Sequence, residues 1–339
     1  MPLHEAHYRH WQGRRTGIWT RRGVIAANGL NGCLKSKWLR RVLAVCWSGA
    51  LAQVAVLFFL GQLLVTDSLA ARSQAGFNLQ LQTILQGLVA WLEQHPEISV
   101  RVSQDFLFYQ LGGFLTSCTM LAIALAIPHL ITRDLSSKAI IIYSSRAIDR
   151  WDYFLGKFGA VLGLITLTWI GPVCFAWCLG NLLAPHWSFF WHARLALMHA
   201  LLYGLCGAVF LGGLALGVSA ISSREKVTVT AWLGLWFVGG VFSSVGRAPR
   251  EVLDSPARYW LEHLSTTFNL QQISASIFRL KDDLQLAQDN IPLFNTLLHG
   301  VSPHAIAAWQ KPDLLGGTVA LVVMLAVAAG LIIWRVKPE

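Results

Sequence analysis

The sequence predicts an all-α integral membrane protein with about six transmembrane helices. Of its 339 residues, 55% are hydrophobic and only 13% are charged, whereas a soluble domain has about 25% charged residues. Six stretches of roughly 20 residues or more are apolar enough to cross a bilayer core of about 30 Å as helices. We expect these spans at about residues 42–65, 106–131, 158–184, 193–221, 227–246 and 314–334.

Lys and Arg residues flank the spans unevenly, and their distribution predicts the orientation of the chain. With the N-terminus inside, the cytoplasmic pieces 1–41, 132–157, 222–226 and 335–339 hold 18 basic residues, and the outer pieces hold eight. Six of those eight lie in 247–313, a loop too long to count under the positive-inside rule. Both termini are therefore expected in the cytoplasm.

The N-terminal 41 residues form a basic segment that we interpret as neither a signal peptide nor a twin-arginine signal, because charges interrupt any apolar core. Residues 18–40 mix apolar and basic side chains in a pattern typical of a helix lying at the membrane interface. A disordered basic tail is the alternative, and it fits residues 1–15 better. In the predicted interfacial helix, the side chains expected to face lipid are Ile18, Trp19, Val24, Ile25, Leu30, Leu34, Trp38 and Leu39.

Charged residues are almost absent from the predicted spans. No Asp or Glu lies within their boundaries, and the one basic residue is Arg194 at the start of the fourth span. Ion-coupled carriers usually need buried ionisable groups, so a secondary transporter is disfavoured, although a carrier for neutral or lipid-like cargo is not. His129 and His199 lie within spans and can titrate, but we expect both to be hydrogen-bonded structural residues.

The sequence contains no catalytic or nucleotide-binding motif. It lacks the G-x-x-x-x-G-K-[ST] phosphate loop, H-E-x-x-H and G-x-S-x-G. We therefore expect a chain that is not an enzyme and that has no catalytic or metal site. Several residues of the last outer segment lack the spacing of metal ligands and are expected to be solvated, namely Glu262, His263, Asp289, His299 and His304.

The loop at 132–157, between the second and third spans, differs from the other loops. An apolar run from about Ser136 to Tyr143 predicts a short amphipathic helix, and a polar break at 144–146 separates it from a new helix start. Asp149 can cap that start, with Asp152 three residues later as its capping-box partner. A partner that binds a short helix held between two spans can move both spans at once.

This loop resembles the corresponding loop in the permease subunits of type-2 ABC (ATP-binding cassette) transporters. There it commonly carries an acidic residue, a small or basic turn and an apolar run, followed by Ser-Arg-(Pro/Ala)-Ile-x-Arg-x-(Asp/Glu)-Tyr-x-x-Gly-Lys. Here the acidic residue is Asp134, the turn begins at Lys138, the run ends at Tyr143, and the pattern extends from Ser145 to Lys157.

Two positions depart from that pattern. The sequence lacks the Gly-Thr that often follows the acidic residue, and Ala147 stands where the family often has Pro. These departures weaken assignment to a subfamily more than to the family. Only this loop matches at the level of a motif, whereas the rest of the chain matches in its plan of helices.

The resemblance implies that the chain forms the translocation pathway of an ABC exporter. A separate ATP-hydrolysing subunit would bind ATP and Mg²⁺, so no cofactor is expected in this chain. Two permeases, either two copies or a copy and a homologue, would join two ATPases in the bacterial inner (cytoplasmic) membrane. Membrane lipids and a periplasmic protein are further expected partners, and nucleic acid is not.

By the same resemblance, the loop would form the coupling contact with the ATPase. Residues 133–143 would make the contact itself, and later charged residues would fix the loop or touch the ATPase. Alternatively, these charges only mark the membrane boundary and orient the protein. The predicted coupling residues are Arg133, Asp134, Ser136, Lys138, Ile141, Tyr143, Arg146, Arg150, Asp152 and Lys157.

The long outer segments 66–105 and 247–313 exceed the length of simple connectors. Amphipathic patterns near 256–281 and 291–298 predict short helices that cap the outer mouth. The resemblance further implies that part of 292–306 dips back into the membrane.

Two other classes of function stay open beside the permease. An energy-independent channel or secondary carrier is disfavoured by the missing carboxylates, and a membrane-embedded enzyme or scaffold by the missing motifs. An uncharged pathway suits hydrophobic or amphiphilic cargo and equally suits a machine that moves a periplasmic partner, so the sequence does not identify the cargo.

Overall fold

The structure, a computed structural model, describes residues 17–63, 95–137, 150–184, 186–246, 257–290 and 303–335. Within these ranges the chain is helical and contains no strand. Six helical stretches in them are long and apolar enough to cross a membrane, so the chain is a multi-pass all-α membrane protein, as predicted. They are Lys37–Gln62, Glu97–Ser136, Trp151–Leu182, Arg194–Ala220, Glu225–Gly246 and Leu314–Arg335.

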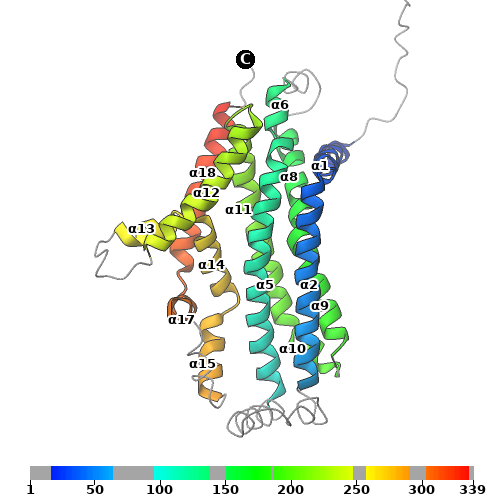
Figure 1. Ribbon diagram of the computed structural model, residues 1–339, viewed down its shortest axis with the longest axis vertical. Helices are drawn as coiled ribbons and strands as arrows, with labels where there is room; N and C mark the ends of the chain where they lie inside the picture. The colour runs from blue at the N-terminus through cyan, green and yellow to red at the C-terminus, as the bar shows by residue number, and fades with distance from the viewer. Residues whose placement is uncertain are drawn as a thin grey trace, which may run out of the picture.

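The spanning helices form an upright bundle in which successive spans run in opposite directions (Figure 1). Their helices are α2 (Lys37–Leu63), α5 (Pro96–Ala126), α8 (Arg150–Ile165) with α9 (Gly171–Leu182), α11 (Arg194–Ala220), α12 (Glu225–Gly246) and α18 (Leu314–Arg335). One end of the bundle carries α6 (Thr132–Ser136), and the other carries α15 (Leu280–Asn290). We call them the α6 end and the α15 end.

Helix α5 is the centre of the bundle. In its most apolar window 67% of the residues are buried, against 17% to 50% in the other spans. Neighbouring helices bond to it through polar side chains: the indole N–H of Trp232 donates to the Met120 carbonyl over 2.9 Å, and that of Trp169 donates to the Gly112 carbonyl over 3.3 Å. These bonds matter because the hydrocarbon core of a membrane offers no water to a buried donor.

The third span is interrupted at its middle. Between α8 and α9 lies the π-helical segment η3 (Thr166–Ile170), directly followed by Gly171 and Pro172. Pro172 has no N–H to donate to the preceding turn, and a wider π turn accommodates the missing hydrogen bond. The third span therefore consists of two helical rods joined by a non-α segment.

Helix α1 (Ile18–Leu34) precedes the first span, where an interfacial helix was predicted. It is seen nearly end-on in Figure 1 and so lies across the upright helices. Ile18 and Trp19 are exposed, as expected of side chains that face lipid. Ile25 and Leu30, predicted to face lipid too, instead pack against α8. Leu39, also predicted to face lipid, lies in α2 and is fully buried.

A row of small residues on α8 permits this packing. Gly156 faces Ile25 so closely that a Cβ added to the glycine would lie 2.7 Å from two Ile25 carbons. Gly159 and Gly163 lie one and two turns further along α8, toward α1 residues Ala26 and Leu30. Glycines at such spacing let two helices approach closely.

The segment after the fifth span is helical, but it does not form only an outer cap. It comprises α13 (Ala257–His263), α14 (Thr266–Ile277) and α15, and α17 (Pro303–Gln310) follows. Helix α14 packs against α5, α11, α12 and α18, so it lies within the bundle. The predicted dip at 292–306 falls largely outside the described residues. A further short helix, α10 (Ser188–His192), links α9 to α11.

Polar bonds hold α14 in this position. His263, predicted to be solvated, is only 6% exposed, and its Nδ1 lies 2.7 Å from the Asn269 amide oxygen. Asn269 also donates to the His263 carbonyl, and Gln272 accepts from the backbone N–H of Asp313 over 2.8 Å. The prediction for His263 was wrong because partners in α14 and beside α18 replace water.

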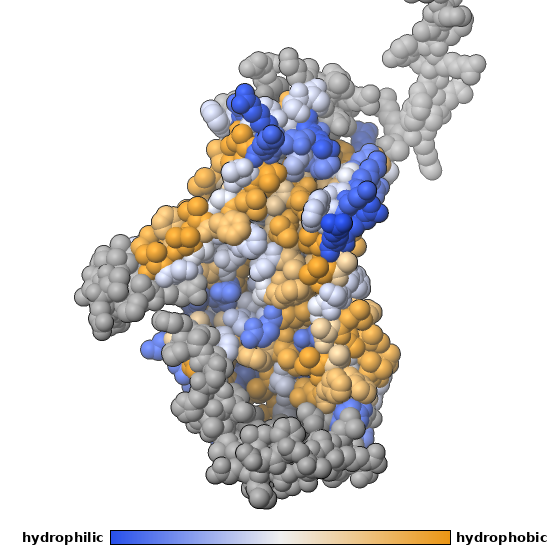
Figure 2. Space-filling view, viewed as in Figure 1, coloured by the Kyte–Doolittle hydropathy of each residue, from blue (hydrophilic) through white to orange (hydrophobic). Residues whose placement is uncertain are grey.

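The surface agrees with a membrane-spanning bundle. Figure 2 shows hydrophobic residues over the middle of the molecule and hydrophilic residues gathered at the α6 end and on α1. The exposed large hydrophobic side chains include Phe59, Phe237 and Val323, on three different spans.

The contact between α1 and α8 predicts opposite effects of the same substitution at two helical glycines. Gly156→Ala should lower the free energy of unfolding by about 1–3 kcal/mol, because the new methyl group collides with Ile25. Gly23→Ala is the matched control, since nothing lies within 4 Å of the added Cβ, and it should be neutral or stabilising by up to about 1 kcal/mol. Thermal unfolding in detergent, followed by tryptophan fluorescence, measures both; equal effects would contradict the close packing.

Candidate functional site

The structure describes the side chains of five predicted coupling residues. Arg133, Asp134 and Ser136 lie on α6, and Asp152 and Lys157 lie on α8. Arg150 begins α8, but its side chain is not described. The other predicted coupling residues lie outside the described residues, as does the predicted cap Asp149; they are Lys138, Ile141, Tyr143 and Arg146.

The helix α6 begins earlier than the predicted amphipathic helix. A 3₁₀ turn, η2 (Ile127–His129), contains Pro128 and connects α5 to α6, so the second span continues to Ser136. Pro128 lacks a backbone N–H and breaks the regular α-helical bonding at this point. Of the predicted helix, the structure describes only Ser136, which ends α6, and Ser137; the rest lies outside the described residues.

Asp134 ties α6 to α8. One of its carboxylate oxygens, Oδ2, accepts a hydrogen bond from the Tyr153 hydroxyl over 2.5 Å and lies 2.7 Å from the Lys157 ammonium. Tyr153 and Lys157 reach the same carboxylate because residues four apart share one face of a helix. The side chains of Asp134 and Lys157 are only 16% and 9% exposed, so this ion pair is largely shielded from water.

Two further ion pairs extend this connection to other helices. Arg22 of α1 contacts Asp152 of α8 over 2.7 Å, and Arg133 of α6 contacts Glu225 of α12 over 2.8 Å. With the Asp134 contacts they link α1, α8, α6 and α12 in series. We call the six charged residues of these pairs the α6-end frame: Arg22, Arg133, Asp134, Asp152, Lys157 and Glu225.

The α6-end frame holds both borders of the segment 138–149. Residue 137 follows α6 directly, and Arg150 begins α8. The two borders thus belong to α6, which continues the second span, and to α8, which begins the third. Arg22 and Glu225 were missed as site residues, because their partners lie 130 and 92 positions away in the sequence.

A second group of charged residues lies toward the α15 end. The prediction that no Asp or Glu lies in a span was wrong, because α5 begins at Pro96 and includes Asp105, which is fully buried. Asp105 Oδ1 lies 3.0 Å from His199 Nδ1 of α11, so His199 is hydrogen-bonded as predicted. His129, in contrast, has a buried Nδ1 with no hydrogen-bond partner in the described structure.

Asp283 of α15 completes this group. It is 3% exposed, and its Oδ1 lies 3.6 Å from Nη2 of Arg101 on α5, beyond hydrogen-bond distance. Burial and the neighbouring Asp105 carboxylate raise the pKa of Asp283 to about 7, while Arg101 acts in the opposite direction. We call Arg101, Asp105, His199 and Asp283 the buried cluster.

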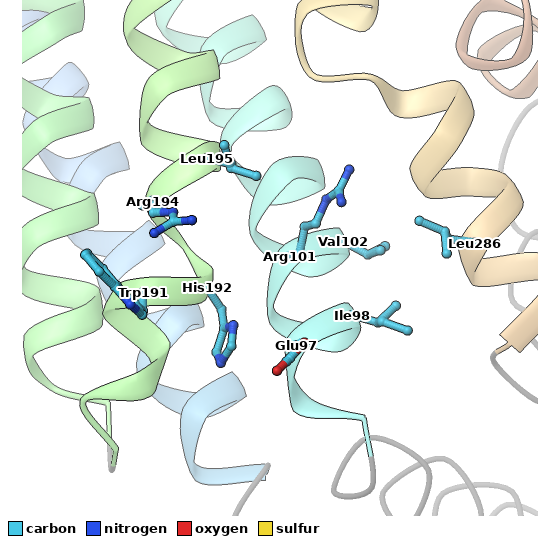
Figure 3. A pocket seen from close by; sticks show the side chains of 9 residues that line it. All are labelled: Glu97, Ile98, Arg101, Val102, Trp191, His192, Arg194, Leu195 and Leu286. Carbon is cyan, nitrogen blue, oxygen red and sulfur yellow. The ribbon is translucent and has the colours of Figure 1, made fainter.

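A cavity of about 230 Å³ adjoins the buried cluster. Figure 3 shows that side chains from α5, from the α10–α11 corner and from α15 surround it. Arg101 belongs to both the cavity and the cluster, and the Arg194 guanidinium lies 4.8 Å from the centre of the Trp191 ring. The lining residues are Glu97, Ile98, Arg101, Val102, Trp191, His192, Arg194, Leu195 and Leu286.

No known protein family matches the chain, and no curated protein matches it either. In the described parts of the chain, no group of three or more His, Cys, Asp or Glu residues is placed to hold a metal ion. The function is therefore inferred from the α6-end frame, the buried cluster and the sequence pattern.

The largely buried Asp134–Lys157 pair predicts a strong effect of removing one partner. Asp134→Asn should destabilise the protein by about 3–5 kcal/mol, because the Lys157 ammonium loses its counterion in a shielded position. The double variant Asp134→Asn with Lys157→Met should recover most of this loss. Thermal unfolding in detergent measures both effects.

Arg133→Gln serves as the control for that experiment. Its pair with Glu225 is about half exposed on both sides, so its loss should cost about 1 kcal/mol or less. An Asp134→Asn variant as stable as Arg133→Gln would show that the shielded pair does not hold α6 to α8.

Proposed function

We propose that the chain is the membrane-spanning permease subunit of a type-2 ABC transporter. The observation that carries this proposal is that Asp134, Tyr153 and Lys157, three residues of the loop that resembles the family, contact one another. These contacts explain why the pattern combines an acidic residue with a later Tyr and Lys, since they hold α6 and α8, the two borders of the loop, together. If the charges of the loop only marked the membrane boundary, the shielded Asp134 carboxylate would have no role.

The proposed orientation places the α6 end in the cytoplasm. The described N-terminal helix α1, the loop borders and Arg335 at the end of α18 all lie at this end. The excess of basic residues in the corresponding parts of the sequence favours this orientation. We infer insertion in the bacterial inner membrane and transport in the direction of export, both on the family resemblance.

In the proposed mechanism, a separate ATPase grips residues 138–149 and binds ATP and Mg²⁺ itself. Movement of the loop passes to the second and third spans through Asp134 and Lys157, and to the fifth through Arg133 and Glu225. The arrangement fits a permease that works with a second copy or a homologue and with two ATPases. The buried cluster lies far from this contact, toward the α15 end.

A secondary carrier is the second candidate, and the buried cluster favours it. Buried ionisable groups within spans commonly mark ion or proton pathways, and Asp105 and His199 are such groups. The two candidates differ in their need for a partner: the purified chain alone in liposomes would transport as a carrier, whereas the permease requires ATP and its ATPase.

Co-purification tests the permease proposal. We expect a tagged chain, expressed in its native host and purified in mild detergent, to retain a nucleotide-binding subunit that hydrolyses ATP. Arg146→Glu should weaken retention of this subunit about tenfold or more, as expected for reversing a charge at an interface. Quantitative mass spectrometry of the purified sample and its ATPase activity measure the effect.

Lys281→Glu is the matched control, because this exposed lysine lies on α15 at the opposite end of the bundle. It makes the same change of charge and should leave ATPase retention unchanged. A chain that purifies alone under several gentle conditions would contradict the permease proposal and favour the carrier.

A further inference from the structure

The buried cluster places two carboxylates where neither is well compensated. Asp105 and Asp283 are 0% and 3% exposed, and they come from helices α5 and α15, which are far apart in the sequence. Oδ2 of Asp105 and both carboxylate oxygens of Asp283 have no hydrogen-bond partner among the described residues. A buried ionised carboxylate without donors is costly, so at least one of these groups needs a proton.

The balance of charge leads to the same conclusion. Arg101 is the one permanent cation of the cluster, and it faces two carboxylates. One proton makes the group neutral, whether it lies between the two carboxylates or on His199, whose Nδ1 is 3.0 Å from Asp105.

Among the residues that the structure describes, Arg101 is the one cation paired with Asp283. On α15 itself, the neighbouring Asp282 pairs with Arg279 over 2.7 Å, and that pair is exposed. Directly after α14, the uncharged ring of Phe278 packs on His199 with ring centres 5.9 Å apart. Three further titratable groups at this end line the adjoining cavity: Glu97 of α5, His192 of α10 and Arg194 of α11.

We propose that the buried cluster is a proton-binding site in which Asp105, Asp283 and His199 together hold one exchangeable proton, and that this proton keeps α15 docked on α5. Loss of the proton leaves two buried anions beside a single arginine, and their repulsion drives α15 away from α5. Arg101, the cation of the site, also lines the adjoining cavity. The proposal is independent of whether the chain is a permease or a carrier.

The first test is the pH dependence of thermal stability of the full chain in detergent. A carboxyl whose pKa is higher in the folded than in the unfolded chain stabilises the fold below its unfolded pKa of about 4, and this stability is lost as pH rises through the folded pKa of about 7. The unfolding midpoint should therefore fall over this range, and Asp283→Asn should reduce the fall because the amide stays neutral. Asp282→Asn, the exposed neighbour, should leave it unchanged.

The second test needs no change to the cluster. Leu284→Cys places a thiol at a buried position of α15, and Lys281→Cys places one at an exposed position of the same helix. The labelling rate of the Leu284→Cys variant is divided by the labelling rate of the Lys281→Cys variant. This division corrects for the rise in thiol reactivity with pH, because the thiolate is the reacting form in both variants. This ratio should rise about tenfold from about pH 6 to about pH 8, as does the deprotonated fraction of a group titrating near neutrality. Mass spectrometry separates the introduced thiols from the native cysteines.

Together the two tests decide the proposal. A wild-type unfolding midpoint whose pH dependence survives Asp283→Asn would overturn the proton site. A normalised labelling rate that stays constant with pH would overturn the docking role. Should Asp283→Asn fail to fold, Asp105→Asn replaces it with the same expected result, and the labelling test stands without either.

Discussion

The burial of α5 among the other spans is the constraint on which the rest of the structure depends. A bilayer core supplies no water to such a helix, so its buried polar groups depend on protein partners, either on neighbouring helices or on α5 itself, as where Thr116 donates to the Gly112 carbonyl. The indoles of Trp232 and Trp169 bond to α5 carbonyls in the middle of the helix. Asp134 accepts a bond just beyond one end of α5, and Asp105 is hydrogen-bonded near the other. The positions of α8, α11 and α12 follow from these bonds as much as from apolar packing.

This constraint also places the two charged groups at opposite ends of one helical element. Asp105 and Asp134 are 29 residues apart, which corresponds to about 40 Å along a helix. The α6-end frame is built from pairs that neutralise each other, and the Asp134–Lys157 pair among them is shielded. The buried cluster instead holds two carboxylates and one arginine, so its charges do not cancel without a proton. We therefore interpret the α6-end frame as a structural clamp and the buried cluster as the proton-binding site.

The sequence predicted the spans well because a transmembrane helix can be identified from its own length and hydropathy, without knowing what it packs against. The fourth span, expected at 193–221, is Arg194–Ala220, and the last, expected at 314–334, is Leu314–Arg335. The start of α5 was placed ten residues late, because its first turns carry Glu97, Arg101 and Asp105 and look like an outer loop. Only the packing of α15 shows that these turns are enclosed.

The contacts of the sites were harder to predict than the helices. The Asp134–Lys157 contact lies within one recognisable block, whereas Arg22–Asp152 and Arg133–Glu225 join residues that no local pattern relates. Helix α14 escaped notice as an element of the bundle because Asn269 and Gln272 make it too polar to look like a span. Their partners, His263 and Asp313, come from two other segments of the chain.

The π segment η3 sets how far a disturbance at one end of the third span can travel. A continuous α-helix transmits rotation about its axis, because each turn is bonded to the next in a fixed register. At Thr166–Ile170 that register changes, and Pro172 has no N–H to bond a carbonyl of the preceding turn. The third span is therefore two α-helical rods whose hydrogen-bond registers differ, so the register of α8 does not fix that of α9, which packs beside α2.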